Sequence, residues 1–180
     1  MKKNVLVFGL ISGLIVSVFC AISGFLCSEK DDFEGSMIIG FSVMIIAFSF
    51  VFVGIKNYRD KYNNGVISFG TAFRLGLYII LIASTMYVIT WLLVYHFFIP
   101  DFMEKYSAHM IKVLKESGAG QAEIDKEVLK MDSLKEMYKN PLFIILLTYA
   151  EILPVGLIIS LIGALIFKRK STNTQTELIG

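Results

Sequence analysis

The sequence has few of the residues that metal, haem and nucleophilic sites require. Its 180 residues include two histidines, two cysteines and one tryptophan. The histidines, His96 and His109, do not make a paired haem or metal site without further ligands. No zinc-type spacing, glycine-rich phosphate loop or nucleophile motif occurs. We therefore predict no catalytic residue, no metal and no cofactor, and a protein that is not an enzyme.

The two cysteines lie too far apart for a disulfide if the segment that contains them is helical. Cys20 and Cys27 would be about 10.5 Å apart along the axis, at about 1.5 Å per residue. A disulfide requires Cα atoms within about 7 Å of each other. We interpret both cysteines as small packing residues, so they say little about the redox compartment.

Charge is also scarce, and neither sign dominates. Charged residues make up 18% of the chain, and the formal net charge is +2. Proteins that bind nucleic acid carry a basic patch or stripe, and no such stripe with interleaved aromatic residues is present. We therefore exclude nucleic acid as a partner.

Apolar residues are abundant instead: 56% of the chain is hydrophobic, and nearly all charges fall between four apolar blocks. Each block is long enough to cross a bilayer, which needs about 20 apolar residues. The sequence therefore predicts an all-α polytopic membrane protein, with a single domain at residues 1–170 that contacts the lipid bilayer. Its four transmembrane helices are expected at residues 4–28, 35–55, 70–99 and 141–167.

The first block has a second interpretation as a signal peptide. It follows Lys2 and Lys3, and Ala21-Ile22-Ser23 resembles a cleavage site. The apolar run continues beyond the usual length of a signal core, which favours an uncleaved first span. Cleavage stays open as the alternative.

Residues 101–140 predict an amphipathic helical hairpin between the third and fourth spans. The run 117–120, Ser-Gly-Ala-Gly, is typical of a helix stop and a turn. The apolar face of the hairpin must cover something, most simply the end of the bundle. Apolar residues recur at helical spacing in both halves: Phe102, Tyr106, Met110 and Val113, then Ile124, Val128 and Met131.

Loop charge predicts the orientation. Lys and Arg are in excess at the amino terminus, at residues 56–74 and at residues 168–170. Four spans bring these segments to one side and the hairpin to the other, and the cytoplasmic side usually holds the basic excess. We predict that both termini are cytoplasmic, that residues 101–140 are extracytoplasmic, and that residues 171–180 form a disordered cytoplasmic tail.

Small residues recur every fourth position in the first and fourth spans. Such stripes let neighbouring helices approach closely in a membrane. We predict that both stripes are helix-packing faces, within the bundle or against a partner. Their members are Gly9, Gly13, Ser17 and Ala21, then Gly156, Ser160 and Ala164.

Glu151 is the best candidate for a functional residue. It is the one carboxylate of the fourth span, about 13 Å from its outer end at 1.5 Å per residue, and a charge at such a depth is costly. Pro154 leaves the carbonyl of Ala150 without its usual donor, which resembles the broken-helix ion sites of transporters. Residues at similar depth that could hold the carboxyl are Tyr87, Thr90, Ser42, Ser49, Ser17 and Cys20.

Four runs of the sequence resemble a known bacterial family. They are YRDKYNNGVISFG at 58–70, DFMEKY at 101–106, KNPLF at 139–143 and EILPVG at 151–156. The chain is similar over about residues 1–170 to the bacterial membrane proteins called domain of unknown function 4199, found mainly in Gram-negative species. The resemblance implies four spans in the inner membrane with the hairpin in the periplasm. It implies no catalytic or ligand residue.

Two functional hypotheses follow, and an intramembrane enzyme is disfavoured because no convergent set of residues is present. The first is a non-enzymatic protein that assembles as a homo-oligomer or with another membrane protein, with Glu151 as buried polar glue. The second is a small permease or proton-coupled transporter that uses Glu151 and the kink at Pro154, together with Tyr87 or Thr90. The second hypothesis requires a water-accessible cavity at the carboxyl, so the surroundings of Glu151 distinguish the two.

Overall fold

The chain is helical almost throughout. The computed structural model describes residues 1–30 and 33–169, so the tail expected at 171–180 lies outside the described residues. Apart from one isolated bridge between Ile67 and Arg169, this part of the chain contains no strand. The helices are α1 (Lys2–Lys30), α2 (Phe33–Phe48), α3 (Phe50–Tyr62), α4 (Phe69–Phe97), α5 (Phe102–Glu116), α6 (Gln121–Tyr138) and α7 (Pro141–Phe167).

Four segments in the described part of the chain are long and apolar enough to cross a membrane. They are Lys2–Phe25, Ile38–Tyr62, Phe69–Phe97 and Pro141–Phe167. The shortest has 24 residues and therefore extends over about 36 Å, more than the roughly 30 Å of a bilayer core.

The second span differs from the expected range of 35–55. It joins α2 and α3 across a turn at Ser49, whose amide nitrogen reaches the carbonyls of both Ile45 and Ile46, at 3.0 and 3.2 Å. The helix then continues through Lys56 to Tyr62. The first charged residue marks where an apolar run stops, but a helix continues into the polar interface because its backbone bonds are internal.

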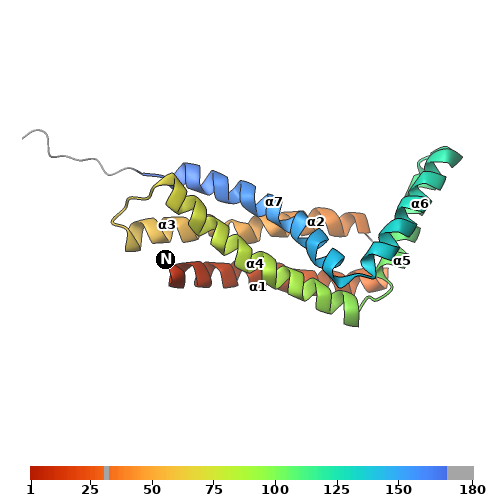
Figure 1. The fold of residues 1–180 in the computed structure, drawn as a ribbon, viewed down its shortest axis with the longest axis horizontal. Coiled ribbons are helices and arrows are strands. Elements are labelled where there is room, and N and C mark those ends of the chain that lie inside the picture. Colours follow the sequence, from red (N-terminus) through yellow and green to blue (C-terminus); the bar gives the residue numbers. More distant parts are fainter. Residues whose placement is uncertain (31–32, 170–180) are drawn as a thin grey trace, which may run out of the picture.

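The helices α1, α2–α3, α4 and α7 lie side by side, with α5 and α6 projecting at one end (Figure 1). The N-terminus and the end of α7 lie together at the opposite end. Helix α4 packs most extensively against α1 and α7. Gly9 and Gly24 of α1 meet Ile82 and Val94, so α1 and α4 run in the same direction.

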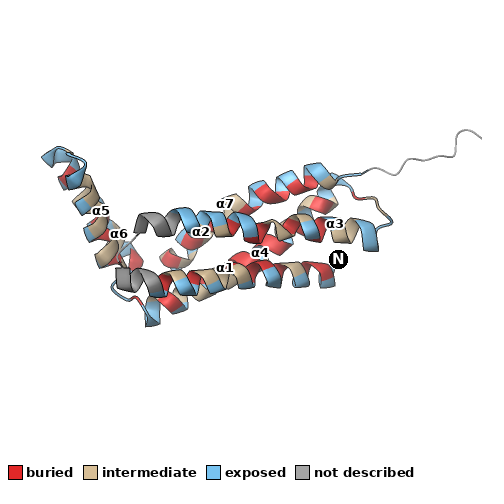
Figure 2. Ribbon diagram, turned by 180° about the vertical axis from the view of Figure 1, so that it is seen from behind, coloured by how far each residue is buried: buried red, intermediate tan, exposed pale blue. Residues whose placement is uncertain are grey.

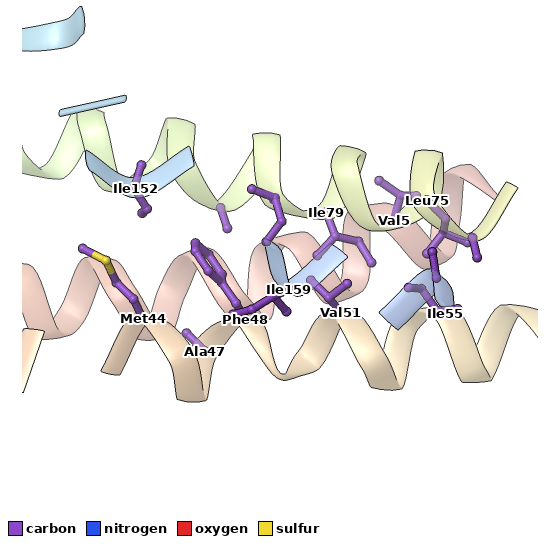
Figure 3. Close-up of a cluster of buried hydrophobic side chains, with 14 of the residues drawn as sticks. Val5, Met44, Ala47, Phe48, Val51, Ile55, Leu75, Ile79, Ile152 and Ile159 are labelled. Carbon is purple, nitrogen blue, oxygen red and sulfur yellow. The ribbon is translucent and has the colours of Figure 1, made fainter. Parts of the chain in front are cut away.

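The core lies where the spans face one another, and apolar side chains also cover the outside. Phe48 and Val51 pack with Ile79 of α4 and Ile159 of α7, and three of these four are fully buried (Figure 3). Exposed residues alternate with buried ones around each span (Figure 2), and many of the exposed side chains are Leu, Ile and Val. An apolar exterior fits helices that are surrounded by lipid.

The predicted small stripe of the fourth span lies inside the bundle. A Cβ added to Gly156 would collide with the Ile80 side chain, and one added to Gly76 would lie 3.0 Å from the Ser160 hydroxyl. Ser160 and Ala164 are fully buried. The small side chains at these positions allow the backbones of α4 and α7 to pack closely against each other.

The stripe of the first span is only partly inside. Gly9 and Gly13 are buried against Ile82 and Met86 of α4, Ser17 is half-buried, and Ala21 is exposed. Residues four apart drift by about 40° per step around a helix of 3.6 residues per turn. A stripe of four therefore turns away from its partner, and Gly24 makes the contact at its far end.

The hairpin is formed by α5 and α6 and closes at Gly118, whose φ of +80° suits glycine better than any L residue. Its base packs on the ends of α4 and α7 through Met103, Tyr138 and Ile144. Asn140 then caps α7 by accepting a hydrogen bond from the Leu142 amide at 3.0 Å, and Pro141 stands at the first helical position, where its missing N–H costs nothing.

Candidate functional site

A cavity lies between the hairpin and the adjoining half of the bundle. Its volume is about 510 Å³, within the roughly 300–1,000 Å³ of small-molecule sites. Six helices and the α4–α5 connection contribute side chains. Among the residues that line it are Val16, Phe19, Cys20 and Ser23 of α1, Phe41 and Met44 of α2, Tyr87 and Trp91 of α4, Phe102, Tyr106 and Met110 of α5, Lys130, Met131 and Tyr138 of α6, and Thr148 and Glu151 of α7.

Helix α7 positions Glu151 by burying the residues on either side of it. Ile144, Thr148 and Ile152 are buried, and the Thr148 hydroxyl donates to the Ile144 carbonyl at 2.7 Å. Ile152 points into the core between α2 and α4 (Figure 3). Glu151 is exposed, and its side chain lines the cavity.

The Glu151 carboxylate faces three other helices across the cavity. It interacts electrostatically with Cys20 of α1, Tyr87 of α4 and Tyr138 of α6. Among the described residues it makes no hydrogen bond and no ion pair. The carboxylate is therefore close enough to one thiol and two hydroxyl groups to interact with them electrostatically, but it forms no hydrogen bond with any of them.

Tyr138 connects the hairpin to the cavity and to the bundle. The Trp91 indole donates a hydrogen bond to its hydroxyl, and the ring makes an edge contact with Tyr95 at 5.6 Å between centroids. Burial, and secondly the Glu151 carboxylate, raise the pKa of Tyr138 to about 12. The hydroxyl is therefore neutral at physiological pH and remains able to donate or accept a hydrogen bond.

Lys130 carries the other formal charge among the described lining residues. Its ammonium lies 3.0 Å from the Glu127 carboxylate, one turn earlier on α6. Because that charge is already compensated on the hairpin, Glu151 is the charged lining group without a counterion in the described part of the chain.

The sequence-predicted site residues separate into two groups. Glu151 and Tyr87 line the same cavity. Thr90 does not line it, and its hydroxyl donates to the Met86 carbonyl of its own helix at 2.9 Å. Pro154 is exposed and lies outside the lining, although α7 continues through it as a helix.

The other residues expected at the depth of Glu151 also differ in role. Ser42 and Ser49 donate to carbonyls of their own segment, Ile38 and Ile46, at 2.9 and 2.6 Å. Ser17 is outside the lining, whereas Cys20, one turn later, is buried and lines the cavity. Depth along a span is therefore not enough to identify neighbours, because each side chain also needs the right rotation about its helix.

Sequence reasoning missed Trp91, Tyr138 and Lys130 as members of the site. The signal that could have found them is the apolar face of the hairpin, which was predicted to cover the end of the bundle. Phe102, Tyr106 and Met110 of that face do line the cavity. The contribution of α6 depends on how the hairpin folds back, which its own pattern does not specify.

The described residues contain no group of three or more His, Cys, Asp or Glu side chains that could hold a metal ion. The arrangement can accept and release a proton at one carboxyl, present neutral tyrosine hydroxyls, and bury an apolar molecule against rings.

Comparison with known proteins is consistent with this membrane architecture and adds no activity. No curated protein and no solved structure matches the chain. One family, described as protein of unknown function (DUF4199), matches residues 7–169. Because that match covers nearly all of the sequence, as the resemblance in its four motifs predicted, the chain belongs to the DUF4199 family.

Proposed function

We propose that this chain is a small permease or proton-coupled transporter, with Glu151 as the group that takes up and releases the ion or proton. One observation carries the proposal: the Glu151 side chain lines a cavity of about 510 Å³ instead of a sealed helix contact. Intramembrane carboxyls usually mark ion or substrate pathways.

The absence of hydrogen bonds to Glu151 from the described residues is the second support. A carboxyl that holds helices together must bond to a neighbouring helix, because an unsatisfied polar group in an apolar environment is costly. Glu151 would bear that cost without such a bond, which fits a group that waits for a ligand or a proton. Pro154 adds to this arrangement, since it frees the carbonyl of Ala150, next to Glu151.

The assembly hypothesis draws less support from the geometry. The small residues of both stripes that are buried already pack against helices of the same chain, so they are not available to a partner helix. These residues are Gly9, Gly13, Gly156 and Ser160. Four spans enclose little space, however, and we propose that the transporter works as a homo-oligomer or with another membrane protein.

We further propose that the protein lies in the bacterial inner membrane with both termini cytoplasmic and residues 101–140 in the periplasm. The support is the charge at the end of the bundle where the N-terminus and the end of α7 lie (Figure 1). Basic residues collect there, and the cytoplasmic side is usually the basic one. They are Lys2, Lys3, Lys56, Arg59, Lys61, Arg74, Lys168 and Arg169.

Proton flux into proteoliposomes tests the transport proposal. The full chain is reconstituted with a trapped pH indicator, and a potassium diffusion potential drives proton entry. We expect the wild-type rate to exceed that of protein-free vesicles and Glu151→Gln to abolish the excess. Glu136→Gln is the matched control, because Glu136 is an exposed hairpin residue paired with Lys139 and such pairs contribute little. Equal rates for wild type and Glu151→Gln would overturn the proposal.

A further inference from the structure

We propose that the cavity beneath the hairpin binds an amphipathic organic cation: an amine or quaternary ammonium group at Glu151 and an apolar body against the surrounding rings. The inference rests on the proposed function in taking this cavity as the working site. It goes further in naming the chemical class of the molecule that the cavity holds.

Charge is the first argument. Glu151 has no counterion among the described residues, whereas Lys130 is already paired with Glu127 at 3.0 Å. An isolated carboxylate loses its hydration in an apolar environment, and a cation of matching position restores much of that energy. The lining therefore favours a positive ligand and opposes a negative one.

Aromatic rings are the second argument. Their faces attract cations, most strongly when water is excluded. Trp91 and Phe102 meet edge to face at 5.0 Å between centroids, and Phe102 stacks with Tyr106 at 5.9 Å. The rings come from five helices and so surround the cavity. They are Phe19, Phe41, Tyr87, Trp91, Phe102, Tyr106 and Tyr138.

The remaining lining decides between an organic cation and a bare metal ion. A metal ion requires several oxygen, nitrogen or sulfur ligands at close range, and the described residues offer no group of three acidic, His or Cys side chains. Methionine, valine and leucine side chains fill the space between the rings. A cation that brings its own apolar body satisfies both parts of the surface.

The chain carries its own reporter for this test, because Trp91 lines the cavity and is the one tryptophan of the sequence. The full chain in detergent micelles, which add no tryptophan of their own, is titrated with three ligands that share one apolar body: 4-phenylbutyltrimethylammonium, 4-phenylbutanol and 4-phenylbutyrate. Tryptophan emission is excited at a wavelength where these ligands do not absorb. We expect a saturable emission change with the ammonium compound, weaker binding of the alcohol and none of the carboxylate.

Glu151→Gln should weaken binding of the ammonium compound by at least about thirtyfold, which is the lower end of the cost of removing one partner of a close charge pair. Binding of the neutral alcohol should stay unchanged, which shows that the cavity is intact. Glu136→Gln serves again as the control. Should Glu151→Gln fail to fold, Glu151→Asp and a pH series on the wild type take its place.

The pH series uses the permanent charge of the ammonium ligand, so that only the protein titrates. The titratable groups that face Glu151 in the described lining are Cys20 of α1, Tyr87 of α4, Tyr106 of α5, and Lys130 and Tyr138 of α6. The lining residues described on α2 include no titratable group, and no histidine belongs to the described lining. Cysteine, tyrosine and lysine ordinarily titrate above about pH 8. Affinity that falls as the pH is lowered from 8 to 4 therefore reports protonation of Glu151.

Equal affinity for the three ligands, or full affinity in Glu151→Gln, would overturn the cation proposal. The outcome is separable from that of the transport proposal. Proton flux that depends on Glu151 without charge preference in binding removes the ligand class and keeps the transporter. Charge-selective binding without Glu151-dependent flux keeps the ligand class and removes the transporter.

Discussion

The interface between α4 and α7 is packed differently in the two halves of the bundle. In the half near the N-terminus, glycine and serine bring the two backbones together: Gly156 meets Ile80, and Gly76 meets Ser160. In the half beneath the hairpin, α4 presents Tyr87 and Trp91 at the same interface, and a cavity takes the place of a tight contact. Helices α4 and α7 are thus close together at small residues in one half and separated by aromatic rings in the other, whereas α1 stays close to α4 beside the cavity, where Gly24 meets Val94.

This contrast explains how a domain of four spans can be both stable and hollow. Fully buried residues such as Leu75, Ile79 and Val51 concentrate in the half near the N-terminus and the end of α7, where packing resembles that of other protein cores. The other half contains Glu151, which has no counterion among the described residues. The stabilising contacts and the proposed binding site therefore lie along different lengths of the same helices, and we expect substitutions in the two halves to have opposite effects on stability.

The largest effect on stability is expected from a substitution that forces α4 and α7 apart where they are tightly packed. In Gly156→Val the new Cβ collides with the Ile80 side chain, and α4 and α7 must separate. Overpacking of this kind costs roughly 1–3 kcal/mol. Thermal unfolding of the purified protein measures the loss.

Gly70→Val is the control for that substitution. Gly70 lies in α4, as Gly156 lies in α7, and has nothing within 4 Å of an added Cβ. Its unfolding temperature should stay near that of the wild type. A Gly156→Val protein as stable as the wild type would mean that α4 and α7 are not in close contact.

A smaller effect, of opposite sign, is expected in the hollow half. Glu151→Leu removes a carboxyl that has no partner among the described residues and that lines a mostly apolar cavity. Replacing charged groups in an apolar environment with apolar groups is often neutral or stabilising. We expect a gain of about 1 kcal/mol in the free energy of unfolding, with loss of Glu151-dependent flux. A carboxyl that served as polar glue would give the reverse result, a clear drop in unfolding temperature.

Much of the fold could be predicted from the sequence because a membrane-spanning helix requires a long apolar run, and such runs can be recognised from composition alone. Four apolar blocks predicted four candidate spans, and the all-α class is confirmed. The break at Ser49 was not predicted because it lies in an uninterrupted apolar run, and the continuation to Tyr62 was not predicted because the expected span ended at the first charged residue, Lys56. Ala21 was assigned to a packing face from its spacing alone, and helical drift turns it outward.

The candidate site was harder to predict, since it depends on how separate elements meet. Glu151 and Tyr87 were identified from depth and chemistry, and both line the cavity. Thr90 was predicted on the same grounds of depth and chemistry, but it does not line the cavity, and its hydroxyl donates a hydrogen bond to the Met86 carbonyl. Tyr138 enters the site only because the hairpin folds its base onto α4 and α7. The orientation of the hairpin relative to the bundle is determined by many weak contacts, which the sequence pattern of a single helix does not predict.

The smallest effect should appear at the junction between the hairpin and the hollow half, and only in alkali. The folded-state pKa of Tyr138 is about 12, above the value near 10 of an exposed tyrosine. Its contribution to stability is therefore complete below about pH 10 and is lost as the pH rises towards 12. Trp91 emission, which senses the hydrogen bond to Tyr138, should change over that interval in the wild type. Tyr138→Phe should remove this pH dependence, and an unchanged alkaline transition in that variant would assign the transition to another group.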